Sequence, residues 1–298
     1  MSQATLRSWD IESRRQEMTQ KNDQVWFITG ANKGMGAAIA KEALNRGYNV
    51  VATARNPERA REILGNSPNL LIAKLDITDD GQVQSAVNGA IDRFGRIDVL
   101  VNNAGYALLG FFEEMSEKLI RQQMETNVFG TMKVTRAVLP LMRTQGSGLV
   151  IVMSSASGIR AVGGSSIYSA SKFALEGWTE GMSADLKPLG IRCMLVEPGP
   201  FRTDFANFDT SLAFSDLKID EYEQRREALY NSFASLNQTQ PGDPAKLAKA
   251  LMTVVNASNP PLRLLAGKAA VGAVDQYLNG RRAEYEAWRE ISASTDFD

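Results

Sequence analysis

Short runs of consecutive apolar residues alternate along the chain with longer segments in which apolar residues recur every three or four positions. Such runs are typical of strands buried on both faces, and the three-to-four spacing is typical of amphipathic helices. This pattern predicts six strands, with a helix after each of the first five. The strands cover residues 25–29, 49–53, 70–76, 97–105, 148–155 and 191–199. The first helix ends near Arg46, and the other four helices cover about 57–64, 79–94, 116–143 and 166–187. This alternation predicts an α/β fold with a doubly wound parallel sheet of the Rossmann type.

The alternation weakens after Pro198. A helix over about 243–256, a candidate last strand over 262–267 and a charged helix over about 275–291 follow. Because no linker rich in Pro, Gly or Ser divides the chain, we expect one domain over 23–298 with an elaborated C-terminal part. An N-terminal extension (1–22) is expected outside this core. Within the domain we expect a substrate-loop or lid region (about 200–240) and a helical C-terminal tail (about 268–298).

Composition excludes several classes of function. The 33 basic and 34 acidic residues nearly cancel, which argues against nucleic acid or an acidic membrane surface as a partner. The chain has no histidine and a single cysteine, so a zinc site of the usual type and a hydrolase with a histidine base are both excluded. Cys193 lies in an apolar strand, where a small core residue is expected rather than a reactive thiol. No apolar run suits a signal peptide or a spanning helix, so we expect a cytoplasmic protein.

Three glycines follow the first predicted strand and open the first helix. Gly30, Gly34 and Gly36 have the spacing G-x-x-x-G-x-G. Small residues there let the backbone approach a pyrophosphate at a helix N-terminus, where free N–H groups favour an anion. A turn that needs glycine for backbone reasons alone is the alternative, and the first-strand context favours a nucleotide.

The end of the second strand indicates which nucleotide. An NAD site usually has an Asp or Glu there to bind the ribose 2′-hydroxyl, but this chain has Thr53, Ala54 and Arg55. Arg55 could instead meet a 2′-phosphate, and Lys33 in the glycine turn could add a second positive charge. We therefore expect NADP(H) as the preferred cofactor without excluding NAD(H). The alternative is two solvated surface cations.

Six motifs in order carry a family resemblance. They are "TGANKGMG" (29–36), "NNAG" (102–105), Asn127, "SSASG" (154–158), "YSASK" (168–172) and "PGPFRT" (198–203). Together the motifs resemble those of the short-chain dehydrogenase/reductase family over about residues 24–203. The stretch "NNAGYALLGFFEEMS" and the long segment after Thr203 look closer to the branch of carbonyl reductases, retinol dehydrogenases and 17β-hydroxysteroid dehydrogenases.

The resemblance implies a catalytic set of Asn127, Ser155, Tyr168 and Lys172. Tyr168 would donate the proton to the substrate oxygen in reduction, Ser155 would orient the carbonyl, and Lys172 would hold the nicotinamide ribose. Asn127 would hold a water that links Lys172 to solvent; an ordinary polar contact is its alternative. Residues four apart share a helix face, so we expect the Lys172 ammonium to lower the pKa of the Tyr168 phenol. Ser154 would point away from the site if Ser155 faces it.

The resemblance also implies the cofactor contacts. Asn103, Ala104 and Gly105 would lie under the adenosine ribose and brace the sheet, and Asp76 would bind the adenine amine or else cap the following helix. Pro198 and Gly199 would lie beside the nicotinamide, with Thr203 at its carboxamide. The full expected set is Gly30, Asn32, Lys33, Gly34, Met35, Gly36, Arg55, Asp76, Ile77, Asn103, Ala104, Gly105, Tyr168, Lys172, Pro198, Gly199 and Thr203.

The expected function is an NADP(H)-dependent oxidoreductase that moves a hydride between the nicotinamide and a carbonyl or secondary alcohol. The alternatives are an NAD-dependent alcohol dehydrogenase of the same family, a nucleotide-sugar epimerase or dehydratase, and a dinucleotide-sensing regulator without catalysis. Seven aromatic residues in 201–233 form either a lid for a bulky hydrophobic substrate or ordinary packing: Phe201, Phe205, Phe208, Phe214, Tyr222, Tyr230 and Phe233. Family members of this shape often pair through the two long helices, so we expect a homodimer or homotetramer.

Overall fold

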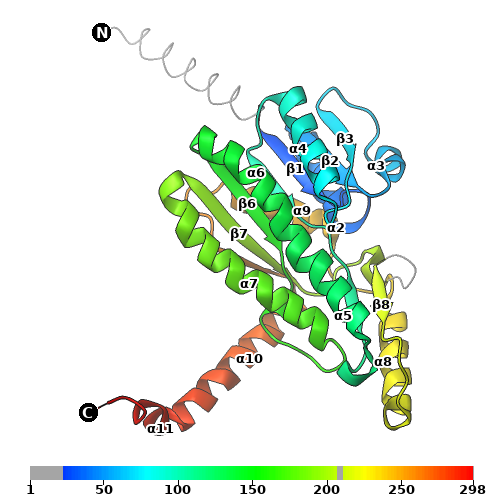
Figure 1. The fold of residues 1–298 in the computed structure, drawn as a ribbon, viewed down its shortest axis with the longest axis vertical. Coiled ribbons are helices and arrows are strands. Elements are labelled where there is room, and N and C mark those ends of the chain that lie inside the picture. Colours follow the sequence, from blue (N-terminus) through cyan, green and yellow to red (C-terminus); the bar gives the residue numbers. More distant parts are fainter. Residues whose placement is uncertain (1–22, 207–210, 298) are drawn as a thin grey trace.

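A seven-stranded parallel sheet forms the centre of the molecule (Figure 1). The computed structural model describes residues 23–206 and 211–297, so the expected N-terminal extension lies outside the described residues. The strand order β3-β2-β1-β4-β6-β7-β9 confirms the predicted doubly wound fold. All six predicted strands and the candidate last strand are present. Their bounds are β1 (Val25–Thr29), β2 (Asn49–Ala54), β3 (Leu70–Lys74), β4 (Val99–Asn102), β6 (Gly148–Met153), β7 (Ile191–Pro198) and β9 (Arg263–Ala266).

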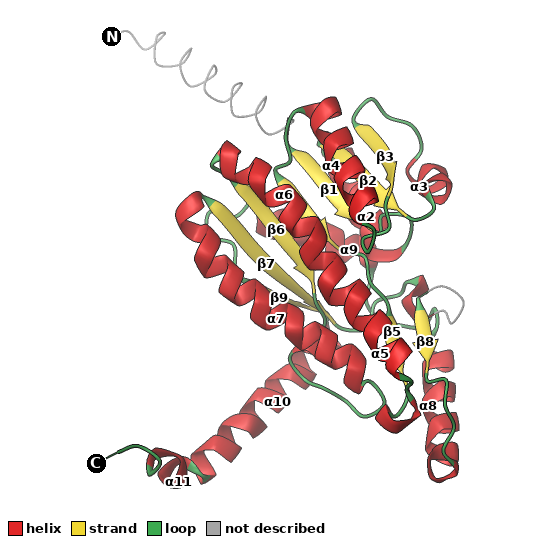
Figure 2. Ribbon diagram, viewed as in Figure 1, coloured by secondary structure: helices red, strands yellow, loops and turns green. Residues whose placement is uncertain are grey.

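Helices cover both faces of this sheet, which explains its continuous apolar strands (Figure 2). Trp26 and Ile28 of β1 pack in one core cluster with α2 (Gly34–Asn45) and α9 (Pro244–Val255). Val25 and Phe27 point to the other face, where α4 (Asp80–Phe94), α6 (Thr131–Gln145) and α7 (Ser166–Leu186) pack. Cys193 of β7 is buried in this second cluster, and burial raises the pKa of its thiol to about 11, as expected of an inert core residue.

The helix predicted over 116–143 is not continuous. α5 (Glu117–Met124) leads into a π-helical turn, η2 (Glu125–Gly130), before α6 begins. The Asn127 side chain is bound to the backbone of Tyr106, and a side chain at Gly130 would press on Ile77 at 2.8 Å. These contacts hold the turn in place, and such single turns often occur at functional sites.

The lid region contains structure that the sequence pattern did not predict. Strand β8 (Leu212–Phe214) pairs in parallel with β5 (Ala107–Leu109) in a small second sheet. Helix α8 (Glu223–Leu236) follows, and short 3-10 turns lie at η1 (Phe112–Glu114), η5 (Asp204–Ala206) and η6 (Asp220–Tyr222). The described residues of the lid region therefore form a layer beside the carboxyl end of the main sheet (Figure 2).

The C-terminal tail is helical, as predicted, but its helix begins seven residues earlier. α10 (Lys268–Ala287) starts directly after β9 and is followed by α11 (Arg289–Ala293). The distal part of α10 and all of α11 extend away from the sheet (Figure 1). Within 23–206 and 211–297, no helix has both the length and the apolar character that crossing a membrane requires.

Candidate active site at the carboxyl ends of the strands

The predicted site residues follow the ends of four neighbouring strands. Because all strands of the main sheet run parallel, their carboxyl ends meet at one edge. Gly30 follows β1, Asn103 follows β4, Ser155 comes two residues after β6, and Gly199 follows β7. This edge is where open α/β sheets bind their ligands.

The glycine turn after β1 packs so closely on its neighbours that it leaves no room for side chains. Gly30 has φ +66°, and a Cβ there would lie 3.1 Å from Cα of Ala104. Gly34 has φ +54° and faces the Thr203 side chain at 3.3 Å, while a Cβ at Gly36 would collide with the Gly30 carbonyl. α2 has no side-chain cap and no acidic residue in its first turn. Its first N–H groups are therefore suited to an anion.

The segment after β4 braces this turn. The Thr29 hydroxyl accepts hydrogen bonds from the backbone N–H groups of Asn103 (2.9 Å) and Ala104 (3.0 Å). The Asn103 amide donates back to the carbonyls of Thr29 (2.9 Å) and Gly30 (3.1 Å). Gly105 leaves space for Asn127, whose Oδ1 would lie 3.0 Å from a Cβ at that position. The expected bracing of the sheet is thus a feature of the structure.

Three cations gather beside the glycine turn. Burial lowers the pKa of Lys33; the charge of Arg59 adds to this, Asp204 opposes it, and Arg55 adds a smaller lowering effect. Lys33 also donates a hydrogen bond to the Ser211 hydroxyl, and Arg55 is exposed. Arg59, which the sequence pattern did not indicate, lies in α3 (Pro57–Leu64), whereas Arg55 precedes this helix.

Arg59 has an acidic partner from a distant part of the chain. Its Nη2 lies 3.1 Å from Oδ2 of Asp204, in η5 of the lid region. The Gln238 amide donates to the other Asp204 oxygen at 3.3 Å. No local pattern indicates this ion pair, because 145 residues separate its partners.

Asp76 does not cap α4. Its Oδ1 accepts hydrogen bonds from the N–H (3.0 Å) and hydroxyl (2.7 Å) of Thr78. The cap is Asp79, whose carboxylate accepts from the N–H of Gln82 at 3.0 Å. The capping alternative for Asp76 is therefore wrong, because three residues of turn separate it from the helix start. Ile77 is buried next to Asp76.

The remaining cofactor candidates lie around the same edge. Asn32 and Met35 are partly buried in the glycine turn, and Met35 packs against the core. Gly199, after Pro198, donates its N–H to the Ala266 carbonyl at 2.9 Å. Thr203 is buried against Gly34, and its hydroxyl accepts from the N–H of Phe205 at 3.1 Å.

Ser155, Tyr168 and Lys172 are brought together and buried. Each side chain is about nine-tenths buried. The Tyr168 phenol shares a side-chain hydrogen bond with Ser155, and Nζ of Lys172 lies 5.7 Å from the centre of the Tyr168 ring. The Lys172 ammonium donates to the Met153 carbonyl at 2.8 Å. Ser154 points elsewhere, toward Gly158.

The expected effect of Lys172 on the tyrosine is not what the structure gives. Burial raises the pKa of Tyr168 to about 12, and the hydrogen bond with Ser155 is the contribution that lowers it. Burial likewise lowers the pKa of Lys172 to about 8, against a raising effect of the Glu176 charge. Burial is therefore the largest influence on the pKa of both groups.

Asn127 connects the π-helical turn to the site. Its Nδ2 donates to the Tyr106 carbonyl (3.0 Å) and the Ser171 hydroxyl (3.1 Å), and its Oδ1 accepts from the N–H of Tyr106 (3.1 Å). Ser171 immediately precedes Lys172, so Asn127 fixes the segment that carries the lysine. These contacts realise the ordinary polar alternative named for Asn127.

The aromatic residues of the lid region divide between packing and the site. Phe201 belongs to the main core. Phe205 faces Tyr168, with 6.1 Å between ring centres, and Phe214 and Phe233 pack on the same cluster. Tyr222 stacks on Phe111 at 4.8 Å, and Tyr230 packs on Phe214 at 5.3 Å. Phe208 lies outside the described residues.

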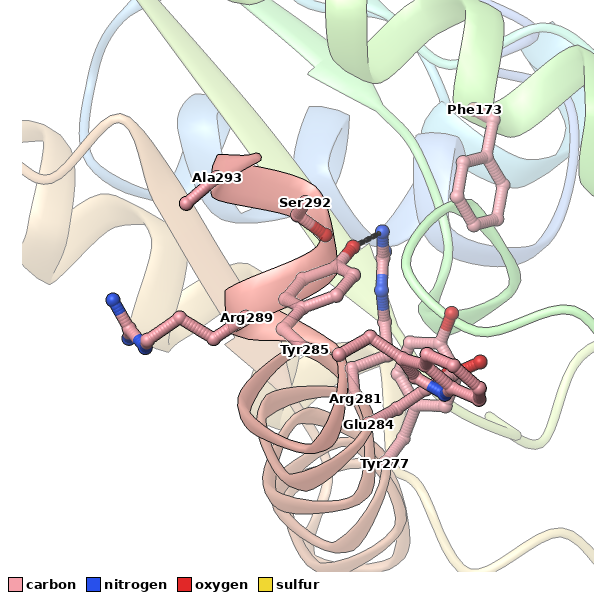
Figure 3. A pocket seen from close by; sticks show the side chains of 9 residues that line it. Phe173, Tyr277, Arg281, Glu284, Tyr285, Arg289, Ser292 and Ala293 are labelled. Atoms are coloured by element: carbon pink, nitrogen blue, oxygen red, sulfur yellow. Dashed lines mark hydrogen bonds between the residues drawn. The ribbon is translucent and has the colours of Figure 1, made fainter. Parts of the chain in front are cut away.

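An open groove lies apart from this site, between α7 and the tail (Figure 3). Its lining contains none of the predicted catalytic residues and is mostly from α10 and α11. Arg281 hydrogen-bonds Tyr285 there, as Figure 3 shows. The lining residues are Phe173, Tyr277, Arg281, Glu284, Tyr285, Trp288, Arg289, Ser292 and Ala293.

Comparison with known proteins identifies the family. Residues 24–211 match the short chain dehydrogenase family model. The chain is 35% identical to oxidoreductase BOA17 of Botryotinia fuckeliana over 91% of its own length and 99% of the relative's, and 34% identical to retinol dehydrogenase 8 of Bos taurus over 80% and 79%. A crystal structure of a short-chain dehydrogenase from Streptomyces avermitilis superposes with a TM-score of 0.84 at 39% identity, covering 92% of this chain and 99% of that one. The chain therefore belongs to the short-chain dehydrogenase/reductase family of NAD(P)-dependent oxidoreductases.

Proposed function

We propose that the protein is an NADP(H)-dependent oxidoreductase that transfers a hydride between the nicotinamide and a carbonyl or secondary alcohol. The observation that carries this proposal is the burial of Ser155, Tyr168 and Lys172 together at the sheet edge, beside the glycine turn. A lysine on the surface and a tyrosine with a purely structural role in the core would not be buried together next to a turn that is suited to an anion.

The residues present fit a dinucleotide. The glycine turn is packed so tightly against Asn103 and Ala104 that Gly30 and Gly36 admit no side chain, and the uncapped N-terminus of α2 follows it. We assign the pyrophosphate to this turn and the 2′-phosphate to the cations Lys33, Arg55 and Arg59. The cations favour NADP(H) because a charge-assisted hydrogen bond to a phosphate oxygen is stronger than one to a ribose hydroxyl.

Further contacts are assigned around the turn. Asp76 and Ile77 lie at the adenine, Asn103 to Gly105 at the adenosine ribose, and Pro198, Gly199 and Thr203 at the nicotinamide. Lys172 holds the nicotinamide ribose through its ammonium group.

The proton chemistry falls to Tyr168. When bound, the nicotinamide supplies or accepts the hydride. With a pKa of about 12 the Tyr168 phenol is fully protonated at neutral pH, which suits a proton donor to the substrate oxygen in the direction of reduction. Ser155 donates a hydrogen bond to the same oxygen and orients the carbonyl. For oxidation the phenol has to lose its proton, and the positive charge of Lys172 then favours the phenolate.

A bulky hydrophobic substrate is supported by the surroundings of Tyr168. Leu109, Leu212 and Phe205 pack around the tyrosine and present an apolar surface from the small second sheet and the lid region. The relative named retinol dehydrogenase 8 points to the same class, an alcohol or aldehyde on a large apolar skeleton.

A turnover assay tests the function. Purified protein is mixed with NADPH and a panel of hydrophobic ketones and aldehydes, and the loss of NADPH absorbance is followed; NADP⁺ with the matching alcohols tests the reverse direction. We expect consumption of NADPH with at least one large apolar carbonyl compound. Tight cofactor binding without turnover across the panel would instead favour a dinucleotide sensor, and faster turnover with NADH would favour an NAD-dependent alcohol dehydrogenase.

A further inference from the structure

A buried acidic group lies next to Lys172. Glu176 and Glu180 of α7, Glu197 of β7 and Arg263 of β9 form this glutamate cluster. Nε of Arg263 lies 3.1 Å from Oε2 of Glu176 and 3.6 Å from Oε1 of Glu197, and its Nη2 binds Oε2 of Glu180. The single positive charge of Arg263 thus faces three carboxylates, so the cluster has a net negative charge when all three are ionised.

Two of these carboxyl groups are far more buried than the third. Glu197 is 2% and Glu176 7% exposed, whereas the Glu180 side chain is 62% exposed. Among the described residues, Oε1 of Glu176 and Oε1 of Glu197 have no hydrogen-bond partner. Adjacent buried carboxylates resist ionising together. The pair therefore favours a state with one proton between them.

The titration behaviour of Glu197 agrees with this geometry. The pKa of Glu197 is raised to about 7, first by burial and then by the charge of Glu176 and a hydrogen bond with it, while Arg263 acts in the lowering direction. Since Nε of Arg263 donates a hydrogen bond to Oε2 of Glu176 at 3.1 Å but lies 3.6 Å from Glu197, Glu197 is the partner that takes up the proton.

Glu176 also lies one helical turn after Lys172 on α7. The two residues lie four apart on α7, both buried, and the negative charge of Glu176 opposes the lowering of the Lys172 pKa by burial. Tyr168 of α7 is the other titratable group beside the lysine, and β6 contributes the neutral Met153 carbonyl. Glu197 of β7 and Arg263 of β9 lie against Glu176. A side chain at Gly158 would press on Cγ of Glu176 at 3.1 Å and on the Lys172 carbonyl at 3.2 Å, so the turn after Ser155 packs directly on this pair.

We propose that Glu176 is a positioning residue that keeps Lys172 cationic, with Glu197 holding the proton that lets Glu176 remain ionised. The pair then sets the pH range over which the lysine can hold the nicotinamide ribose. This inference rests on the proposed role of Lys172 in binding the cofactor, but its electrostatic part does not.

Glu176→Gln removes the charge at nearly constant size. An opposite charge at close range moves a pKa by about 1–3 units, so Lys172 should lose its proton about one pH unit lower in this variant. Glu176→Asp keeps the charge and should largely keep the wild-type titration. Glu180→Gln is the matched control, because it removes a carboxylate from the same Arg263 without touching Lys172.

The first experiment follows the Lys172 side chain itself by NMR in isotopically labelled protein, with its signal assigned by its loss in Lys172→Ala. We expect the midpoint to fall by about one unit in Glu176→Gln and to stay in place in Glu176→Asp and Glu180→Gln. Glu197→Gln should keep the midpoint but lose a smaller inflection near pH 7. An unchanged Lys172 midpoint in Glu176→Gln overturns the proposal, whatever that variant does to thermal stability.

The second experiment measures NADPH binding by fluorescence across the same pH range. We expect the alkaline loss of affinity to begin about one unit lower in Glu176→Gln than in Glu180→Gln. A shifted lysine midpoint with unshifted NADPH binding overturns the assignment of the pair to cofactor binding. If the unmodified protein binds neither NADPH nor NADH, the function proposed above fails, and the NMR result still decides whether Glu176 sets the charge of Lys172.

Discussion

The Tyr168 phenol is the group on which the proposed proton transfer depends, and its surroundings show what its removal would change. The ring is held by Phe205, Leu109 and Leu212, so a phenylalanine fits the same space. Tyr168→Phe should lower kcat by about 10²- to 10⁴-fold, the usual cost of losing a general acid, and leave NADPH affinity nearly unchanged.

Steady-state kinetics and cofactor titration of the same preparation check this. Tyr48→Phe is a suitable control, because it removes a buried phenol that stacks on Trp26 in the opposite core cluster. Near-normal turnover in Tyr168→Phe would overturn the mechanism.

Three cations determine the proposed cofactor preference. A hydrogen bond to a charged group corresponds to about a 10- to 150-fold preference. We expect NADPH to exceed NADH in kcat/KM for the unmodified enzyme. Arg55→Ala and Arg59→Ala should each erode that preference through the KM for NADPH, with Lys33→Ala acting in the same direction.

A neighbouring arginine supplies the control for this series. Arg61→Ala removes a charge from the same helix, but Arg61 is paired with Glu58 at 2.8 Å and has no part in the cation group. Its kinetics should match those of the wild type. Equal weakening of both cofactors by Arg55→Ala would mean that the cation is structural and that another group binds the ribose.

The raised pKa of Glu197 should change how the free energy of unfolding depends on pH. Its pKa in the folded protein is raised to about 7 from the ordinary value of 4.5. The folded state therefore holds the proton more tightly than the unfolded chain, so the stability it contributes is complete below pH 4.5 and is lost as the pH rises through about 7. Urea unfolding of wild type and Glu197→Gln should show the wild type losing stability relative to the variant across that interval. Parallel pH curves for the two proteins would show that Glu197 ionises normally.

At the scale of elements, a buried ion pair fastens the lid region to the body. Glu114 of η1 is fully buried, pairs with Arg226 of α8 and accepts the N–H of Ile219 at 2.9 Å. Removing one partner of a buried pair costs roughly 3–5 kcal/mol, and partial exposure of Arg226 places the expected loss near the lower end. Glu114→Ala should therefore lose about 3 kcal/mol in urea unfolding.

The neighbouring acidic residue tests whether burial is the cause. Glu113 is exposed and binds the Tyr222 hydroxyl, so Glu113→Ala should change stability very little. Because the lid region also contributes Phe205 to the surroundings of Tyr168, Glu114→Ala should raise the KM of an apolar substrate. Equal effects of the two substitutions would mean that Glu114 acts through local structure rather than through its buried charge.

The elements also show which features a sequence can reveal. The seven strands of the main sheet could be predicted because helices cover both faces of the sheet, which makes most residues of each strand apolar. β5 and β8 were missed because each has three residues and finds its partner across the chain, with Ala107 paired to Leu212. The π-helical turn was missed because its cause, the hydrogen bonds of Asn127 to Tyr106, lies outside the helix pattern.

The candidate site likewise combines features that local sequence patterns show with features that only the folded chain creates. The four-residue spacing of Tyr168 and Lys172 and the glycine turn are local patterns. The predicted direction of the Tyr168 pKa shift was wrong because burial, which local spacing does not show, raises this pKa. The Arg59–Asp204 ion pair and the cluster of Glu176 and Glu197 with Arg263 arise from segments that only the folded chain brings together.

At the scale of the whole molecule, the surface of the long helices bears on assembly. Phe129 of η2 is 53% exposed and Phe173 of α7 is 39% exposed. Family members of this shape often pair through these helices, so the expected homodimer or homotetramer would cover such side chains. In a symmetric interface each residue occurs twice, so a charge introduced there acts on both subunits.

Phe129→Glu tests this directly. Light scattering of the unmodified protein at micromolar concentration should give two or four times the mass of one chain, and the variant should dissociate because its carboxylates would be buried in the contact. Leu278→Glu, at an equally exposed position in α10, is the control and should leave the assembly intact. A monomeric wild type contradicts pairing altogether. Dissociation by Leu278→Glu with an intact Phe129→Glu assembly would place the contact on the projecting tail, because only the helix that extends from the body would then have lost its apolar surface.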